Sequence, residues 1–135
     1  MTQTAITYPN VTRNEMTGET IRTILEDVAD NLFNEDPYYQ QGGDMVRVGG
    51  LKYAIDPTRG IGERISDMSL NGKAIDPKKK YVVAGWASVQ EVPAGDTGFA
   101  IWDVVSDYLR AKKTIGAVDV NEPVIKGVPN NPGMA

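Results

Sequence analysis

The chain has 135 residues, of which 41% are hydrophobic and 24% are charged, and its net charge is -4. This length suits one compact domain that buries roughly two thirds of its unfolded surface, and the acidic balance argues against nucleic acid or an anionic membrane as a partner. The absence of cysteine and histidine excludes thiolate nucleophiles, Ser-His-Asp triads and the usual zinc sites.

The first secure element along the chain is a helix. Residues 1–16 open with a short apolar run and a turn signal at Pro9-Asn10, and residues 11–16 alternate so weakly that an edge strand or coil is predicted there. After Thr17, a suitable N-cap, apolar residues recur at spacings of three and four up to Phe33, which predicts an amphipathic helix of about four turns. The acidic residues on or beside its polar face, which we interpret as solvated rather than metal-binding, are Glu26, Asp27 and Asp30.

Residues 42–50 form a short segment with a glycine pair at each end. If residues 44–48 form a strand, Met45 and Arg47 point to one side. Asp44, Val46 and Val48 then point to the other. The glycine pairs indicate either a sheet corner, the favoured interpretation, or a close approach of the backbone to another group. The guanidinium of Arg47 suits the oxygens of sulfate, phosphate or carboxylate, although an ordinary surface ion pair is the more frequent role.

Three further strands are predicted over residues 51–55, 64–70 and 81–86. Asn71-Gly72 follows the second of them and is a strong signal for a type I′ hairpin. The third is a continuous apolar run, which suits a strand buried on both faces. The middle of the protein is therefore predicted to be an antiparallel sheet.

A second helix is predicted with Asp96 as its cap and with apolar residues from Phe99 to Leu109. Residues 114–135 are predicted to form a partly extended tail with one short strand. The predicted fold class is therefore α+β, a mainly antiparallel sheet packed by two helices in a single domain over residues 1–135.

Aromatic residues supply the remaining candidates for a site. Trp86 ends a predicted strand beside a glycine-containing loop, a place where binding sites often lie, and a core tryptophan is the alternative. Four tyrosines can line a cleft or an interface, although such rings more often half-bury. They are Tyr8, Tyr38, Tyr39 and Tyr53.

The order of these motifs resembles the C-terminal domain of the 5′-nucleotidase superfamily over nearly the whole chain. The motifs that carry the resemblance include residues 42–50, 71–73, 80–84 and the Gly-Asp-Thr-Gly-Phe run at 95–99. Within the superfamily, residues 36–50 and 85–89 are similar to the SoxB thiosulfohydrolases of the sulfur-oxidation (Sox) pathway.

The resemblance implies a periplasmic two-domain enzyme whose N-terminal metallophosphatase-like domain holds two manganese ions with His, Asp and Asn ligands. This chain would be the substrate-binding C-terminal domain, truncated at its N-terminal edge, with no catalytic residue, metal ligand or cofactor of its own and no activity alone. The implied partners are its own N-terminal domain and the SoxYZ carrier protein, and no nucleic acid or membrane. The implied reaction is hydrolysis of a cysteine S-thiosulfonate on that carrier, which releases sulfate.

The resemblance also implies a set of substrate-binding residues. Nucleotidases sandwich the base between two aromatic rings; Met45 stands where one ring is expected, and Phe99 keeps the other behind an inserted threonine. Arg47 stands where a neutral residue is frequent and suits a sulfonate or an acidic group of a partner. The full predicted set is Arg47, Trp86, Met45, Phe99, Asp96, Tyr8 and Asn10.

Two alternative functions stay open at this point. The first is the same domain in a 5′-nucleotidase-like phosphoesterase, against which Met45 and the altered 95–99 loop argue. The second is a stand-alone protein-interaction module, against which the abrupt start inside a strand-and-turn region argues.

Overall fold

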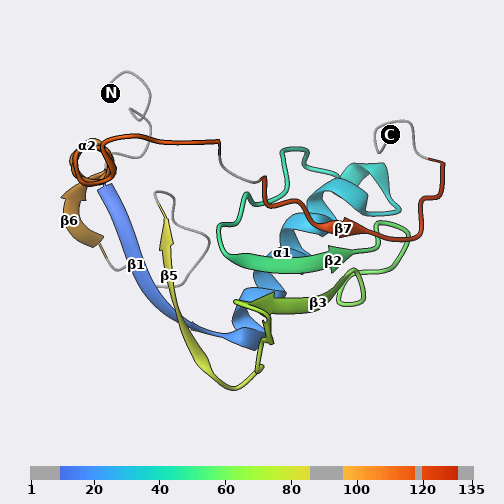
Figure 1. Cartoon of the computed structure of the whole chain (residues 1–135). Coiled ribbons are helices and arrows are strands. Elements are labelled where there is room, and N and C mark those ends of the chain that lie inside the picture. The colour runs from blue at the N-terminus through green and yellow to red at the C-terminus, as the bar shows by residue number, and fades with distance from the viewer. Residues whose placement is uncertain (1–9, 86–95, 118–119, 131–135) are drawn as a thin grey trace. The chain divides into compact units, whose positions relative to one another are not determined.

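The computed structural model describes residues 10–85, 96–117 and 120–130. The chain divides into two compact units, and each has its own sheet (Figure 1). Unit 1 contains residues 1–16 and 80–119, and unit 2 contains residues 17–79 and 120–135. The α+β class is confirmed, and the predicted sheet is divided between the two units.

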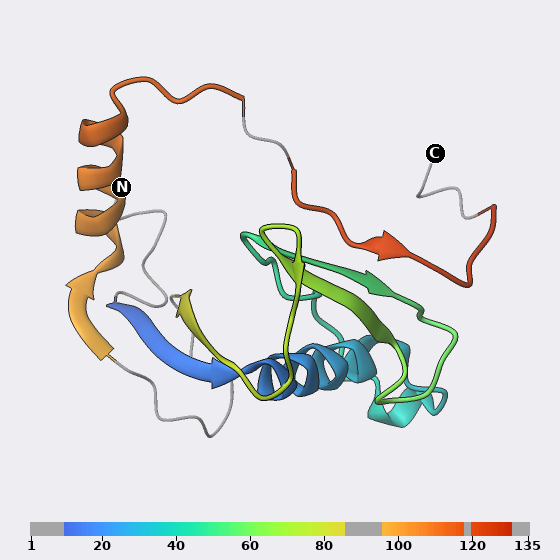
Figure 2. The same cartoon turned by 60° about the horizontal axis from the view of Figure 1, so that its bottom comes forward.

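Unit 2 is built on helix α1, Gly18–Phe33, which confirms the predicted amphipathic helix. Thr17 is its N-cap, because the Thr17 hydroxyl accepts a hydrogen bond from the backbone N–H of Thr20 at 3.1 Å. Helix α1 lies across one face of the neighbouring strands (Figure 2). A short 3₁₀ helix, η2 (Pro37–Tyr39), follows it.

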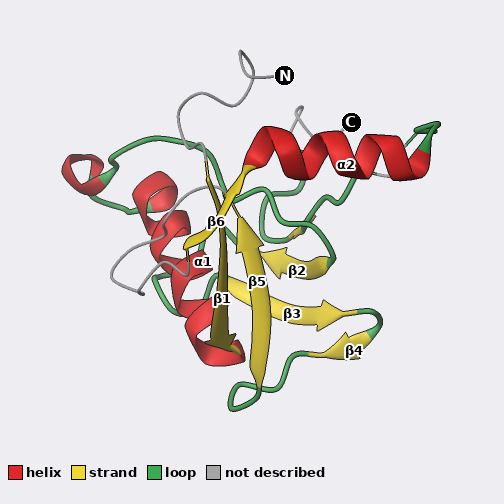
Figure 3. Ribbon diagram, turned by 90° about the vertical axis from the view of Figure 1, so that its left-hand side faces the viewer, coloured by secondary structure: helices red, strands yellow, loops and turns green. Residues whose placement is uncertain are grey.

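The sheet of unit 2 has the strand order β4-β3-β2-β7. Its strands are β2 (Leu51–Ile55), β3 (Ile65–Leu70), β4 (Lys73–Ala74) and β7 (Val124–Ile125). The first three pair antiparallel, as predicted, whereas β7 runs parallel to β2 and brings the tail of the chain beside it (Figure 1). Asn71 and Gly72 turn the chain from β3 to β4 (Figure 3), and their φ angles of 52° and 74° agree with the predicted hairpin.

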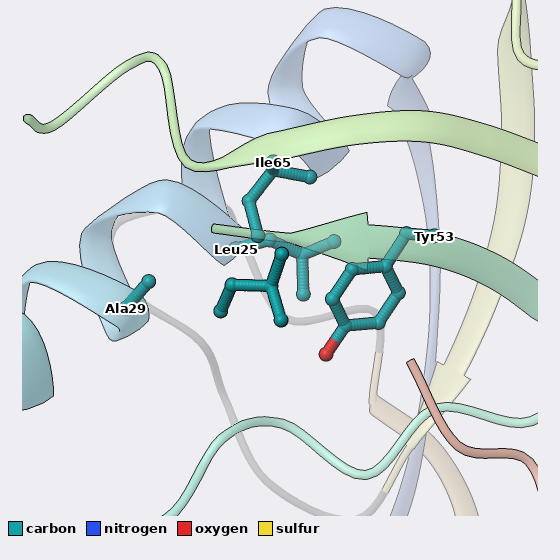
Figure 4. Close-up of a cluster of buried hydrophobic side chains, with 5 residues drawn as sticks. Leu25, Ala29, Tyr53 and Ile65 are labelled. Atoms are coloured by element: carbon teal, nitrogen blue, oxygen red, sulfur yellow. The ribbon is translucent and has the colours of Figure 1, made fainter. Parts of the chain in front are cut away.

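The core of unit 2 lies between α1 and the β2–β3 pair (Figure 4). Leu25 and Ala29 lie one turn apart on α1, whereas Tyr53 and Ile55 lie two residues apart on β2. The helical and strand periodicities therefore direct these side chains, together with Ile65, into one cluster. Burial in this cluster raises the pKa of Tyr53.

A buried carboxylate links α1 to the start of β3. Glu26 is only 4% exposed, and its side chain accepts hydrogen bonds from the backbone N–H groups of Gly62, Arg64 and Ile65 at 2.9, 3.3 and 2.7 Å. The prediction of a solvated acidic face is therefore wrong for Glu26. The three backbone amides take the place of water around the carboxylate. They come from a distant part of the chain, so the helical pattern gives no sign of them.

A buried arginine makes the second link between the same elements. Arg64 is 2% exposed; its Nη1 donates to Asp30 Oδ1 at 2.7 Å and its Nη2 donates to the Phe33 carbonyl at 2.9 Å. Asp30 also accepts a hydrogen bond from Asn34 Nδ2 at 2.7 Å. These contacts fix the C-terminal end of α1 against β3.

The Asp30–Arg64 pair makes unit 2 sensitive to acid. The hydrogen bond from Arg64, with a second from Asn34, holds the pKa of Asp30 below its usual value. A carboxylate with a lowered pKa stabilises the fold above its unfolded pKa of about 4, and this contribution is lost as the pH falls through the folded-state pKa. We expect Asp30→Asn to lower stability at neutral pH and to flatten its decline in acid, measured by urea unfolding across pH. An acid profile equal to that of the unaltered chain would contradict this; Asp107→Asn, in an exposed ion pair, is the control.

Unit 1 contains a sheet with the order β5-β1-β6 and a helix that follows β6 (Figure 3). The elements are β1 (Asn10–Thr17), β5 (Lys80–Gly85), β6 (Asp96–Ala100) and α2 (Ile101–Lys112). Strand β1 lies between the other two, so the prediction of an edge strand or coil there is wrong. Within the described part of the chain, neither α1 nor α2 is long and apolar enough to cross a membrane.

Two other predictions for unit 1 are wrong. β5 is not buried on both faces: it pairs with β1 alone in the described sheet, and Val82 is 55% exposed. Asp96 does not cap a helix, because residues 96–100 form β6 and the N-cap position of α2 is Ala100, which makes no side-chain cap hydrogen bond. Pairing with β1 keeps this segment extended and outweighs the local cap signal.

Candidate functional site

The glycine-bracketed segment is irregular, so the prediction of a strand over residues 44–48 is wrong. Gly42, Gly43 and Gly50 have φ angles of 76°, 104° and 82°. Residues with a side chain rarely adopt this region, and it turns the backbone away from a strand at both ends. The glycine pairs therefore make an irregular connection between η2 and β2.

Core packing decides where the side chains of this segment point. Met45, Val46 and Val48 all pack against the buried cluster of unit 2. Arg47 points to solvent, and 84% of its side chain is exposed. The prediction that Met45 and Arg47 share one face is wrong, because the consecutive residues Met45 and Val46 both pack against the core.

Arg47 makes an exposed ion pair. Its Nη2 lies 3.0 Å from Asp44 Oδ2, and the Asp44 side chain is 77% exposed. Such a pair contributes at most about 1 kcal/mol in water. The guanidinium can therefore exchange Asp44 for the oxygens of an anion at little cost, and its planar donors suit two oxygens at once.

The tyrosines divide into two kinds. Tyr53 is a core residue, which agrees with the simpler interpretation. Tyr38 and Tyr39 on η2 are 86% and 58% exposed, and their rings meet edge to face with centroids 5.5 Å apart. Exposed tyrosine rings of this kind can line an interface, because each combines an apolar ring with a polar hydroxyl.

Three predicted site residues lie on the paired strands β1 and β6 of unit 1. Asn10 pairs with Ala100, which follows Phe99, and Thr12 pairs with Asp96. Phe99 is 65% exposed, so its ring is available to a ligand or a partner surface. The structure thus gathers Asn10, Asp96 and Phe99 on one strand pair, although Asn10 is 86 positions from Asp96 and 89 from Phe99 in the chain.

The other two predicted residues of this unit, Tyr8 and Trp86, lie outside the described residues. The residue before Trp86 is fixed, because the Thr12 hydroxyl donates to the Gly85 carbonyl at 3.2 Å. Thr12 therefore ties the end of β5 to β1.

Thr97 is the residue inserted before Phe99 relative to the nucleotidase motif, and it has a structural role that the sequence did not indicate. Its hydroxyl donates to the Val11 carbonyl at 2.6 Å and accepts from the backbone N–H of Phe99 at 3.2 Å. Gly98 between them has a φ of 69°. Thr97 therefore orients the backbone of Phe99. A threonine followed by a glycine is a local turn signal, because the threonine hydroxyl can accept a hydrogen bond from the backbone N–H two residues later.

The described side chains provide recognition chemistry. In unit 2, the exposed Arg47 guanidinium can bind oxyanions. In unit 1, Phe99 presents an exposed aromatic ring. Across residues 10–85, 96–117 and 120–130, no three His, Cys, Asp or Glu side chains gather in a way that could hold a metal ion.

Comparison with known proteins identifies relatives over most of the chain. A family model described as 5′-nucleotidase, C-terminal domain, matches residues 4–102. A solved structure of the sulfate thiohydrolase SoxB from Thermus thermophilus, in complex with glycerol, is 34% identical with a TM-score of 0.78, covering 93% of this chain and 24% of that one. No curated protein matches the chain.

Two other solved structures share the fold at lower identity. A putative 5′-nucleotidase from Staphylococcus aureus, in complex with alpha-ketoglutarate, is 17% identical with a TM-score of 0.64, covering 87% of this chain and 27% of that one. A 5′-nucleotidase precursor from Thermus thermophilus is 20% identical with a TM-score of 0.63, covering 90% and 26%. The chain spans about a quarter of the length of these three solved chains.

Proposed function

The chain belongs to the 5′-nucleotidase C-terminal domain family, and from this premise we propose that it is the substrate-binding C-terminal domain of a SoxB-type thiosulfohydrolase. The enzyme hydrolyses a cysteine S-thiosulfonate on a carrier protein. Water forms a bond to the terminal sulfur, the bond between that sulfur and its neighbour breaks, sulfate leaves, and a persulfide stays on the carrier.

The observation that carries the proposal is the graded similarity to solved relatives. Identity to the sulfate thiohydrolase is 34% over 93% of the chain, whereas identity to the two 5′-nucleotidases is 17% and 20%. The TM-scores follow the same order, at 0.78 against 0.64 and 0.63. Sequence and backbone geometry therefore both favour the sulfate-releasing relative.

The residues of the candidate site agree with a small anionic group as the substrate. Met45 replaces a stacking ring, and its side chain packs against the core of unit 2, so it offers no second aromatic face for a base. Arg47 presents a guanidinium whose only ionic partner in the described residues is the exposed Asp44. A terminal sulfonate carries three oxygens and suits this donor.

The proposal extends to parts that this chain does not contain. An N-terminal metallophosphatase-like domain is the first partner; the two manganese ions that it would hold would supply Lewis acidity and an activated water. The SoxYZ carrier is the second partner, and the periplasm is the compartment. The part of this chain in the reaction is to bind and orient the sulfonate.

Replacing Arg47 tests the proposal in the full-length enzyme. We expect Arg47→Ala to lower kcat/KM for sulfate release by about 30-fold, because charge-assisted hydrogen bonds to the sulfonate are lost. Trp86→Ala is expected to lower it as well. The matched control is Arg110→Ala, since Arg110 forms the same kind of exposed ion pair, with Asp107 at 2.8 Å. A loss in Arg47→Ala that merely follows unfolding, or that Arg110→Ala reproduces, would overturn the assigned role.

A further inference from the structure

The tail of the chain contacts the end of the glycine-bracketed segment through one side chain. Asn121 Nδ2 donates to the Val48 carbonyl and to the Leu51 carbonyl, each at 2.8 Å. The two carbonyls lie on either side of Gly49-Gly50, and Gly50 has a φ of 82°. Asn121 therefore closes this turn from outside, 70 positions along the chain from the nearer partner.

The strand register explains why a side chain is needed here. β7 pairs with β2 so that Ala54 lies opposite Val124 and Ile55 lies opposite Ile125, and the chain before Val124 brings Asn121 within hydrogen-bond distance of the Leu51 carbonyl. Lys126 N donates to the Ile55 carbonyl at 2.8 Å, and β7 begins only at Val124, so the described ladder ends before it reaches the Leu51 carbonyl. Beyond the end of the ladder, the Asn121 side-chain amide is the donor that bonds to the Leu51 carbonyl.

This contact acts on the residues that the proposed function uses. Val48 is held in two ways: its side chain packs against the core, and its carbonyl accepts a hydrogen bond from Asn121. The backbone that directly follows Arg47 is therefore fixed. The ion pair of Arg47 with Asp44 is exposed and contributes little to holding the segment. Asn121 is therefore the contact best placed to order the segment on its β2 side.

We infer that Asn121 is a positioning residue that closes the 48–51 turn and thereby fixes the Arg47 backbone for the sulfonate; this inference rests on the proposed function. The Asn121 Nδ2 amide is occupied by the Val48 and Leu51 carbonyls. Its effect passes through the two carbonyls to the segment, so loosening the turn weakens substrate binding more than the chemical step.

The matched variants are Asn121→Asp and Glu122→Gln. Asn121→Asp keeps the shape but replaces the donor by an acceptor facing two carbonyls, whereas Glu122 is a neighbour on the same tail. In the full-length enzyme we expect Asn121→Asp to raise KM for the thiosulfonate carrier about tenfold with kcat changed less than about twofold. Glu122→Gln should change neither. If Asn121→Asp fails to fold, Asn121→Ala removes the donor without adding a charge.

Two further measurements separate positioning from a general structural role. The double variant Asn121→Ala with Arg47→Ala should lower kcat/KM by less than the product of the two single losses, because the Arg47 side chain that Asn121 positions is already absent. Backbone amides of residues 46–51 should exchange hydrogen about tenfold faster in Asn121→Asp, with the amides of α1 unchanged. Unchanged exchange overturns the closure of the turn, and faster exchange with an unchanged KM overturns the positioning role. If the unaltered enzyme releases no sulfate, the proposed function fails, and the exchange measurement still decides whether Asn121 closes the turn.

Discussion

Replacing Glu26 by alanine is expected to lower the free energy of unfolding by about 4 kcal/mol, among the largest effects of a single substitution in this chain. The carboxylate accepts hydrogen bonds from three backbone amides that precede and begin β3, and the side chain is nearly fully buried. Its removal leaves these donors without a partner and opens a cavity beneath them.

Conservative and remote substitutions make this prediction specific. Glu26→Gln keeps one acceptor oxygen but turns an amide nitrogen toward the same donors, so we expect it to cost about 2 kcal/mol. Glu19→Ala changes an acid in the first turn of the same helix and should cost less than about 1 kcal/mol. Urea unfolding of the 135-residue chain measures all three. Equal stabilities for Glu26→Ala and Glu19→Ala would contradict the buried acceptor role.

The second large effect is expected at Gly18, the first residue of α1. A Cβ atom there would overlap the Asp76 carbonyl oxygen and the Cγ2 atom of Ile75. The carbonyl belongs to the backbone and cannot move aside as a flexible side chain could. We therefore expect Gly18→Ala to lower the free energy of unfolding by about 3 kcal/mol.

The cost follows from how α1 begins. Gly18 N donates to the Lys79 carbonyl and Glu19 N donates to the Pro77 carbonyl, both at 3.0 Å, so the 76–79 turn serves as the outer cap of the helix. Displacing this turn loses both bonds. Gly60→Ala is the matched control, because Gly60 has a negative φ and open space around its Cβ position, and it should stay within about 0.5 kcal/mol. A Gly18→Ala variant as stable as Gly60→Ala would refute the close approach.

Elements specified by local signals were predictable from the sequence. The helix from Gly18 to Phe33 combines an N-cap threonine with an apolar face, and both signals lie within or directly beside the element itself. The Asn71-Gly72 hairpin likewise follows from the positive φ angles that these two residues tolerate. Neither prediction depends on distant parts of the chain.

Elements decided by distant contacts were not predictable in the same way. Residues 44–48 alternate like a strand, yet three left-handed glycines and core packing of adjacent residues give an irregular segment. Asp96 has the chemistry of a helix cap, yet pairing of β6 with β1 keeps it in a strand. Glu26 has the pattern of a surface acid, and only the amides beside β3 explain its burial.

The candidate site was predictable in its chemistry and less so in its arrangement. Arg47 presents an exposed guanidinium, as its residue type suggests. Met45, two residues earlier, packs against the core instead of sharing a face with Arg47. Asn10 and Phe99 belong to paired strands, a proximity that only the β1–β6 register shows. The supporting residues Thr97 and Asn121 act through backbone groups, which residue patterns rarely reveal.

The most direct test of the central proposal compares two activities of the full-length protein with manganese supplied. One assay follows sulfate release from a carrier cysteine S-thiosulfonate, and the other follows phosphate release from a nucleoside 5′-monophosphate. We predict that kcat/KM for sulfate release exceeds that for the nucleotide by about 100-fold or more. Preferential hydrolysis of the nucleotide would contradict the proposal and assign the chain to a phosphoesterase of the same family.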